Sequence, residues 1–231
     1  MTKKILLTIS ALFITQLSFA QIEFDDYVSQ VGEAMDGTTI YAFQATEVEG
    51  NPLLFDEFVR GVLVSGNSQT VPVNLNIDLA NNRILVNRGN KLIGIENSAV
   101  SAIKIMTPSL TFKNGFQTGG KDDLNKYSLF KVIHEGDNVT FLKHTGVSLQ
   151  KDVSSYSTAT KTDAFIQYTA YYVIKDGKFD RVKMRKRNVL RLFDDNRKAV
   201  DTYAKENKLD FKDDEHLALM FKYAESLALN N

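Results

Sequence analysis

The chain has 231 residues, carries 28 Lys and Arg against 28 Asp and Glu, and contains neither Cys nor Trp. Balanced charge leaves no global field that would attract nucleic acid or an anionic membrane. The lack of Cys excludes disulfides, thiol nucleophiles and Cys-based zinc sites. The lack of Trp argues against a carbohydrate site built on stacked indole rings, a role that tyrosine could still fill.

Met1 to Ala20 has the three-part pattern of a cleavable secretory signal peptide. Lys3-Lys4 supplies the charged start, and residues 5–15 form an apolar run that is too short to cross a bilayer as a helix. Ser18-Phe19-Ala20 then places small residues before Gln21, and no Cys follows for a lipid anchor. We therefore expect an exported protein, periplasmic, on the outer surface or secreted, with a mature chain of about 211 residues and no transmembrane segment after cleavage.

Residues 21–187 predict a β-rich domain, mainly antiparallel, in the form of a bent meander, half-barrel or barrel. Short runs of β-branched and aromatic residues alternate with turns of Gly, Asn and Asp from about Leu53 to Met184. The two clearest hairpins pair Tyr127–His134 with Val139–Thr145, and Phe165–Ile174 with Phe179–Met184. Strands of this length joined by tight turns favour an open or closed antiparallel sheet.

Two stretches of this domain are less regular. Gln21 to Gly50 combines helical spacing around Tyr27 with a strand-like run from Thr38 to Val48. Lys151 to Asp163 is rich in Ser and Thr and is predicted to be a long polar loop, either a solvated connection or a functional segment.

Residues 188–231 predict two to three helices packed on the sheet. Asn188, the run Asp194-Asp195-Asn196 and Asp213 are candidate helix starts. In the last helix, apolar residues recur at the i, i+3, i+4 spacing of a buried stripe: Leu217, Met220, Phe221, Ala224 and Leu227. The overall fold class is therefore α+β, with the helices after the strands.

The segment Gly50-Asn51-Pro52-Leu53-Leu54-Phe55-Asp56-Glu57-Phe58-Val59-Arg60-Gly61 resembles the opening of a group of exported bacterial proteins of unknown function. In that group a Gly-x-Pro-Tyr-Leu segment precedes a run of short strands and a basic, helical C-terminal part, which is similar to Lys183 through Leu227 here. Leu53 stands where the group has Tyr. The resemblance implies export and the order of strands followed by helices, and it implies no site residues.

Motifs for catalysis or metal binding are missing. A metal site would need His134, His144 and His216 to meet, or carboxylate help, and the hairpin register places His134 opposite Phe141 rather than His144. Four acidic pairs lack the spacing of a calcium loop and fit helix caps or turns better: Asp25-Asp26, Asp122-Asp123, Asp194-Asp195 and Asp213-Asp214. Neither a Gly-x-Ser-x-Gly elbow nor a P-loop is present. We expect no catalytic, cofactor-binding or metal-binding residues.

A run of basic residues is the sharpest local feature. On a strand, alternate residues share one face, and the resulting candidate patch for an anionic ligand comprises Arg181, Lys183, Arg185 and Arg187. A phosphate group or lipopolysaccharide would suit such a patch. The alternative is a solvated face balanced by Asp180, Asp194 and Asp195.

Three functions remain open on this sequence. The first is an exported, non-enzymatic binding or interaction protein with an unknown protein, glycan or lipid partner. The second is a periplasmic carrier that encloses a hydrophobic ligand inside the bent sheet. The third is a hydrolase of unknown type, which would need carboxylates or histidines to meet in a cleft.

Overall fold

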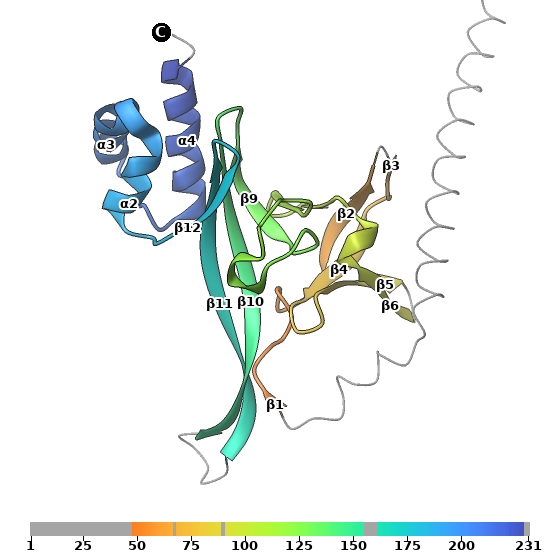
Figure 1. The fold of residues 1–231 in the computed structure, drawn as a ribbon. Helices are drawn as coiled ribbons and strands as arrows, with labels where there is room; N and C mark the ends of the chain where they lie inside the picture. Colours follow the sequence, from red (N-terminus) through yellow and green to blue (C-terminus); the bar gives the residue numbers. More distant parts are fainter. Residues whose placement is uncertain (1–47, 67, 89–90, 155–160, 229–231) are drawn as a thin grey trace, which may run out of the picture. The chain divides into compact units, whose positions relative to one another are not determined.

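The computed structural model describes residues 48–66, 68–88, 91–154 and 161–228 (Figure 1). The predicted signal peptide and the helix and strand predicted before Val48 lie outside these residues. The chain divides into two compact units. The first unit contains the described residues up to Thr111 together with Val147–Ile166, and the second contains Phe112–Gly146 and the residues from Gln167 onward.

Antiparallel strands build the first unit. They are β2 (Val59–Ser65), β3 (Ser68–Gln69), β4 (Val73–Asp78), β5 (Arg83–Arg88), β6 (Lys91–Glu96) and β7 (Ala102–Ile105), with the 3-10 turn η2 (Asn97–Ala99) before β7. Their order is β7-β2-β4-β5-β6, and β3 pairs with β2. The short β1 (Val48–Glu49) pairs in parallel with the start of β11, where Val48 lies opposite Asp163.

Both faces of β4 are buried at its end, which its alternating sequence does not predict. Leu75 and Ile77 enter the apolar core, but Asn76 on the other face is also fully buried. The Asn76 side chain donates to the Phe55 carbonyl (2.8 Å) and accepts from the Phe55 amide (3.1 Å). The Asn76 side chain therefore supplements the backbone pairing that holds the segment before β2 against β4, in which the Leu54 amide donates to the Ile77 carbonyl at 2.8 Å.

The second unit holds the rest of the sheet. Its strands are β8 (Leu110–Lys113, which enters the unit at Phe112), β9 (Phe130–Glu135), β10 (Val139–Ser154), β11 (Lys161–Lys175) and β12 (Lys178–Val182), and the turn η3 (Lys121–Asp123) lies between β8 and β9. The order is β8-β9-β10-β11-β12. The sheet is open, so the fold class of a mainly antiparallel sheet followed by helices is confirmed without closure into a barrel.

The long polar loop predicted for Lys151 to Asp163 is wrong at both of its ends, and residues 155–160 in its middle lie outside the described residues. β10 continues to Ser154 and β11 already begins at Lys161. Around Ser148 to Lys151 the side chains of β10 are exposed, so this part of the strand has no buried face to impose an apolar alternation. Thr and Ser are compatible with such a solvated strand.

The helices follow β12, as predicted. They are α2 (Lys186–Leu190), the 3-10 turn η4 (Arg191–Asn196), α3 (Arg197–Glu206) and α4 (Asp214–Ala228). Asp213 caps α4, because its Oδ1 accepts the backbone amides of Glu215 and His216 at 2.9 Å each. In Figure 1 the helices lie beside the strands of the second unit.

Two clusters of buried apolar residues lie on opposite faces of β9 to β12. Neighbouring residues of one strand alternate between them, as Phe141 and Leu142 do on β10. The helix-side cluster joins the strands to the helices through Phe141, Val173, Val182, Val189, Phe193, Val200, Leu217, Met220 and Phe221, among others. The loop-side cluster contains Leu124, Phe130, Leu142, Ala170, Tyr172 and Phe179. The helices therefore cover one face of this part of the sheet. Their packing positions α2 and η4 beside the β11–β12 hairpin.

Candidate functional site

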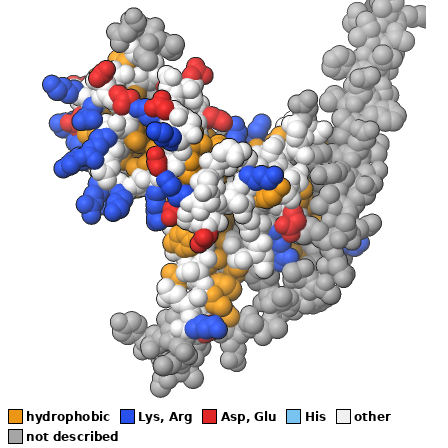
Figure 2. Space-filling model, viewed as in Figure 1, with side chains coloured by type: hydrophobic (Ala, Val, Ile, Leu, Met, Phe, Trp, Pro, Cys, Tyr) orange, Lys and Arg blue, Asp and Glu red, His pale blue; other side chains and the backbone are white. Residues whose placement is uncertain are grey.

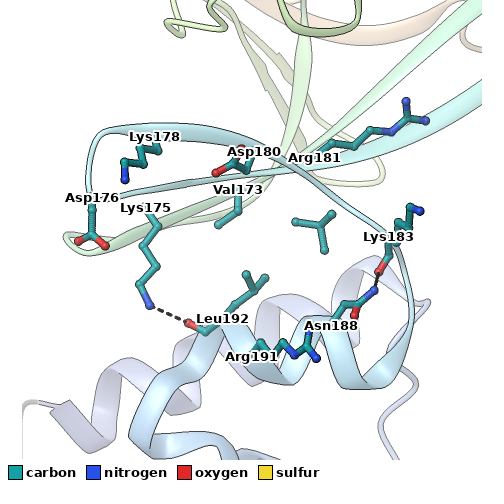
Figure 3. A pocket seen from close by; sticks show the side chains of 11 residues that line it. Val173, Lys175, Asp176, Lys178, Asp180, Arg181, Lys183, Asn188, Arg191 and Leu192 are labelled. Atoms are coloured by element: carbon teal, nitrogen blue, oxygen red, sulfur yellow. Dashed lines mark hydrogen bonds between the residues drawn. The ribbon is translucent and has the colours of Figure 1, made fainter.

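A pocket of about 530 Å³ lies between the β11–β12 hairpin and the α2–η4 segment (Figure 3). All the residues that line it come from one continuous segment, residues 173–192. The lining residues are Val173, Lys175, Asp176, Lys178, Asp180, Arg181, Val182, Lys183, Asn188, Arg191 and Leu192.

Two local turns shape this pocket. Asp176 and Gly177 both have positive φ (51° and 70°), the geometry of the two-residue turn that best matches strand twist. After β12 the chain reverses again at Lys183, whose carbonyl accepts the amide of Arg185 (2.7 Å) and the side chain of Asn188 (3.1 Å). The second turn brings α2 back beneath the hairpin.

The lining carries five Lys or Arg side chains against two Asp, a net formal charge of +3. Two of the five have carboxylate partners outside the lining. Lys175 pairs with Asp194, and Arg181 pairs with Asp122 at 3.3 Å. In Figure 3 Lys175 reaches from β11 toward the Leu192 carbonyl, whereas the guanidinium of Arg181 is directed away from the helices.

One carboxylate of the lining is already neutralised. Lys121 donates to Asp180 at 2.6 Å, and this hydrogen bond, with the charge of Lys121, holds the pKa of the Asp180 carboxyl below its usual value. Counting Lys121, Asp122 and Asp194 with the lining, six cations face four carboxylates, so the site keeps a net charge of +2.

Lys178, Lys183 and Arg191 are the cations available to a ligand. All three are exposed, and none forms an ion pair within 4.0 Å with a carboxylate of the described residues. Figure 2 shows lysine and arginine side chains gathered over the helical part of the second unit. Arg191 also offers a planar fork of N–H donors that matches an oxyanion.

The wall facing the core is apolar. Val173 and Val182 are buried members of the helix-side cluster, and Leu192 packs against that cluster while remaining partly exposed. The pocket thus combines a basic rim with an aliphatic floor, and both are held by the same packed core.

The predicted basic patch is divided by the fold. Arg181 and Lys183 line the pocket, but Arg185 immediately precedes α2 and Arg187 lies within it, and neither lines the pocket. The shared strand face does not exist, because β12 ends at Val182. The apolar pair Val189 and Leu190 reaches the helix-side cluster only if the chain turns into a helix.

Sequence reasoning missed Lys175 and Lys178 as members of this site. Both flank the Asp176-Gly177 turn and lie opposite each other in the register. Lysines beside a hairpin turn are ordinary surface residues, and only the return of α2 beneath the hairpin gives them a pocket to line. No signal in the sequence reports that return.

The histidines occupy three separate environments. His134 lies opposite Phe141, as predicted, and its Nε2 is 3.1 Å from Glu225 Oε1. His144 is hydrogen-bonded to the Leu129 carbonyl, and burial lowers its pKa. His216 accepts the amide of Asp210 through Nδ1. In the described part of the chain, acidic and histidine side chains form no group of three or more that could hold a metal ion.

The acidic pairs within the described residues serve local contacts. Asp122 accepts the Tyr172 hydroxyl at 2.7 Å, Asp194 pairs with Lys175, and Asp213 caps α4. Asp214 binds Lys131 and Lys143. Among the same residues, no helix combines the length and apolar composition that a membrane crossing requires.

Comparison with protein-family models, with curated proteins and with solved structures finds no significant match to this chain. The structure itself shows an open, mainly antiparallel sheet followed by C-terminal helices, with a basic pocket beside the last hairpin.

Proposed function

We propose that the protein is an exported binding protein, without catalytic activity of its own, that holds an anionic ligand in the pocket beside β12. One observation carries the proposal: Lys178, Lys183 and Arg191 line one concave site, and none of the three forms an ion pair within 4.0 Å with a carboxylate of the described residues. Cations gathered in a pocket raise the local concentration of anions, and walls of low dielectric strengthen each interaction.

The local arrangement supports an anionic ligand better than a purely hydrophobic one. Seven of the eleven lining residues are charged, and they border a wall whose exposed surface is mostly apolar. Export follows, in this proposal, from the signal-like segment Met1 to Ala20 and from the resemblance of residues 50–61 to exported proteins.

Calorimetric titration with inorganic phosphate at low ionic strength tests the proposal. We expect wild-type protein to bind, and the double variant Lys183→Gln with Arg191→Gln to bind about tenfold more weakly or worse, because it loses two nearby positive charges. The matched control is Arg197→Gln with Lys212→Gln, which removes the same charges from exposed positions outside the pocket.

The control pair should retain the wild-type affinity. Equal weakening in both double variants would mean that only the general charge of the surface matters. Absence of phosphate binding to the wild-type protein at low salt would refute an anion site in this pocket.

A further inference from the structure

We infer that the protein forms a two-fold dimer in which β6 of one copy pairs antiparallel with β6 of a second copy. β6 is the last strand in the order of the sheet, and it pairs with β5 on one side (Figure 1). The inference concerns the first unit and does not depend on the pocket beside β12.

One row of backbone groups on β6 is directed away from β5. Arg88 and Lys91 lie opposite each other at the connection between the two strands, and only two residues separate them. A connection of this length closes with a hydrogen-bonded pair, so alternate residues of β6 direct their N–H and C=O groups toward β5. Leu92, Gly94 and Glu96 therefore direct theirs to the open side, where no strand of the described part of the chain pairs with β6. Such a row is a template for a further strand.

The composition of β6 leaves this edge unprotected. Edge strands are commonly guarded against pairing by charged residues or proline. β12, an edge strand beside β11, has exposed charges along its length at Lys178, Asp180 and Arg181. β6 has charges only at its two ends, Lys91 and Glu96, and the four residues between them are apolar or glycine. The chain therefore protects the edge of β12 and leaves β6 able to accept a strand.

The two end charges favour a second copy of the same strand in antiparallel orientation. Lys91 and Glu96 are exposed, and neither forms an ion pair within 4.0 Å with another described residue. Antiparallel pairing places the Lys91 end of each strand beside the Glu96 end of the other, so opposite charges approach at both ends. Parallel pairing would bring like charges together. A second copy thus matches the charge pattern of β6 by symmetry.

Two-fold symmetry and the open-side groups select one register, centred on Gly94. In this register Leu92 pairs with the partner's Glu96, and all three open-side residues of each copy are hydrogen-bonded. Ile93 lies opposite the partner's Ile95, and the two side chains contact each other across the strands. A register centred on Ile93 would use only two of the three open-side residues within β6. Because a two-fold axis pairs residues of the same face, the lysine lies beside the partner's Glu96 and not directly opposite it.

Sedimentation velocity over a series of concentrations tests the dimer. We expect the purified protein to change from monomer to dimer between about 1 µM and about 300 µM, because pairing of one strand buries a small area and gives weak association. Lys91→Glu should weaken the dimer about fivefold or more, since like charges then meet at both ends. Glu96→Lys should do the same.

The two substitutions test self-complementarity when they are combined. A chain with both Lys91→Glu and Glu96→Lys again has opposite charges at its ends, and it should dimerise with about the wild-type constant. An equimolar mixture of the two single variants should form mixed dimers more tightly than either variant associates with itself. The matched control is Lys104→Glu at an exposed position of β7, which should leave the wild-type constant unchanged.

Oxidative cross-linking tests the register, and the absence of Cys from the chain makes it specific. Gly94→Cys places two thiols at the two-fold axis, within the distance that a disulfide spans. A Cβ at Gly94 fits the fold, because its nearest neighbour would be Arg83 Cδ at 3.5 Å. We expect this variant to form a disulfide-linked dimer, whereas Lys104→Cys should stay monomeric under the same oxidation.

Three results would overturn the inference. The first is a protein that stays monomeric up to about 300 µM. The second is a dimer whose constant ignores both end charges, because its interface would then lie elsewhere. The third is cross-linking of Lys104→Cys as readily as Gly94→Cys. Circular dichroism verifies the fold of each variant, and if Gly94→Cys is unfolded the charge series at the exposed ends of β6 remains decisive.

Discussion

Asp214 joins the start of helix α4 to the sheet through three polar contacts. Its Oδ2 accepts Lys131 at 2.8 Å and Lys143 at 3.0 Å, and its Oδ1 accepts the Tyr171 hydroxyl at 3.0 Å. It also lies in the first turn of α4, where a negative charge is favourable to the helix dipole. Burial raises the pKa of Asp214, but the hydrogen bonds and charges of the two lysines outweigh burial, so the pKa lies below its usual value.

Replacing Asp214 with Asn should lower the free energy of unfolding by about 2 kcal/mol at pH 7, because two half-buried lysines lose their shared partner. Since the folded-state pKa of Asp214 lies below the unfolded-state value of about 4, its contribution is complete above that value and disappears as pH falls through the folded-state pKa. The gap between wild type and Asp214→Asn should therefore narrow below about pH 4, as measured by urea unfolding from pH 7 to pH 3.

The control for this measurement is Asp195→Asn, an exposed aspartate of η4 without a carboxylate–cation contact within 4.0 Å in the described residues. It should change stability by less than about 0.5 kcal/mol. A gap for Asp214→Asn that stays constant down to pH 3 would show that shape and hydrogen bonding, rather than charge, carry the effect.

Other residues show why polar positions are hard to place from sequence. Asp78 and Arg83 form an ion pair at 3.0 Å with both side chains almost wholly buried. Their pattern in the sequence is that of an ordinary turn between two strands, and solvent exposure would be the default expectation. The burial of these two side chains depends on which other segments cover the β4–β5 hairpin, and the residues of the hairpin do not indicate those segments.

At the scale of elements, α4 is the clearest case in which periodicity predicts packing. Leu217 is fully buried in the helix-side cluster, whereas Leu219, two residues later, is 44% exposed. We expect Leu217→Ala to lower the free energy of unfolding by about 2–5 kcal/mol, as a truncated core leucine does. Leu219→Ala should cost less than about 0.5 kcal/mol. Chemical denaturation of the two variants, matched in chemistry and helix, measures the difference, and similar losses would contradict the observed orientation of α4.

Turn chemistry predicted the hairpins of the second unit well. Asp176-Gly177 connects β11 and β12 as expected, and His134 lies opposite Phe141. These features follow from short-range rules, since two adjacent residues with positive φ determine a tight turn and the turn determines the register. The capping role of Asp213 and the buried stripe of α4 are local in the same sense.

Strand ends were predicted poorly where the pattern depends on distant packing. The end of β12 at Val182 and the start of α2 at Lys186 fall inside a run of alternating basic residues that is compatible with a longer strand. The strand ends here because Val189 is buried in the helix-side cluster, which requires the chain to turn into α2. A short stretch of sequence around Arg185 gives no indication of this burial. Of the predicted basic patch, Arg181 and Lys183 therefore line the pocket, and Arg185 and Arg187 do not.

At the scale of the whole molecule, export is the property that the sequence indicates most directly. The segment that indicates it, Met1 to Ala20, lies outside the described residues. Expressed in a bacterium with its full sequence, the chain should be recovered from the periplasm or medium with Gln21 as its first residue, measured by intact mass. Ala20→Leu should block cleavage, because the peptidase requires a small residue there, whereas Ala11→Leu inside the apolar run should not. Recovery of the wild-type chain in the cytoplasm with Met1 to Ala20 retained would contradict the signal peptide.

The division into two units bears on how such a protein can change. All the lining residues of the pocket belong to one uninterrupted stretch of twenty positions, from Val173 to Leu192, within the second unit. If the proposed function is correct, this short stretch sets the preference for the ligand, and its apolar wall is shared with the core whereas its charged rim is not. Substitutions at exposed rim positions such as Lys178 or Lys183 would then change the ligand without disturbing the packed residues, so related proteins could bind different ligands on the same fold.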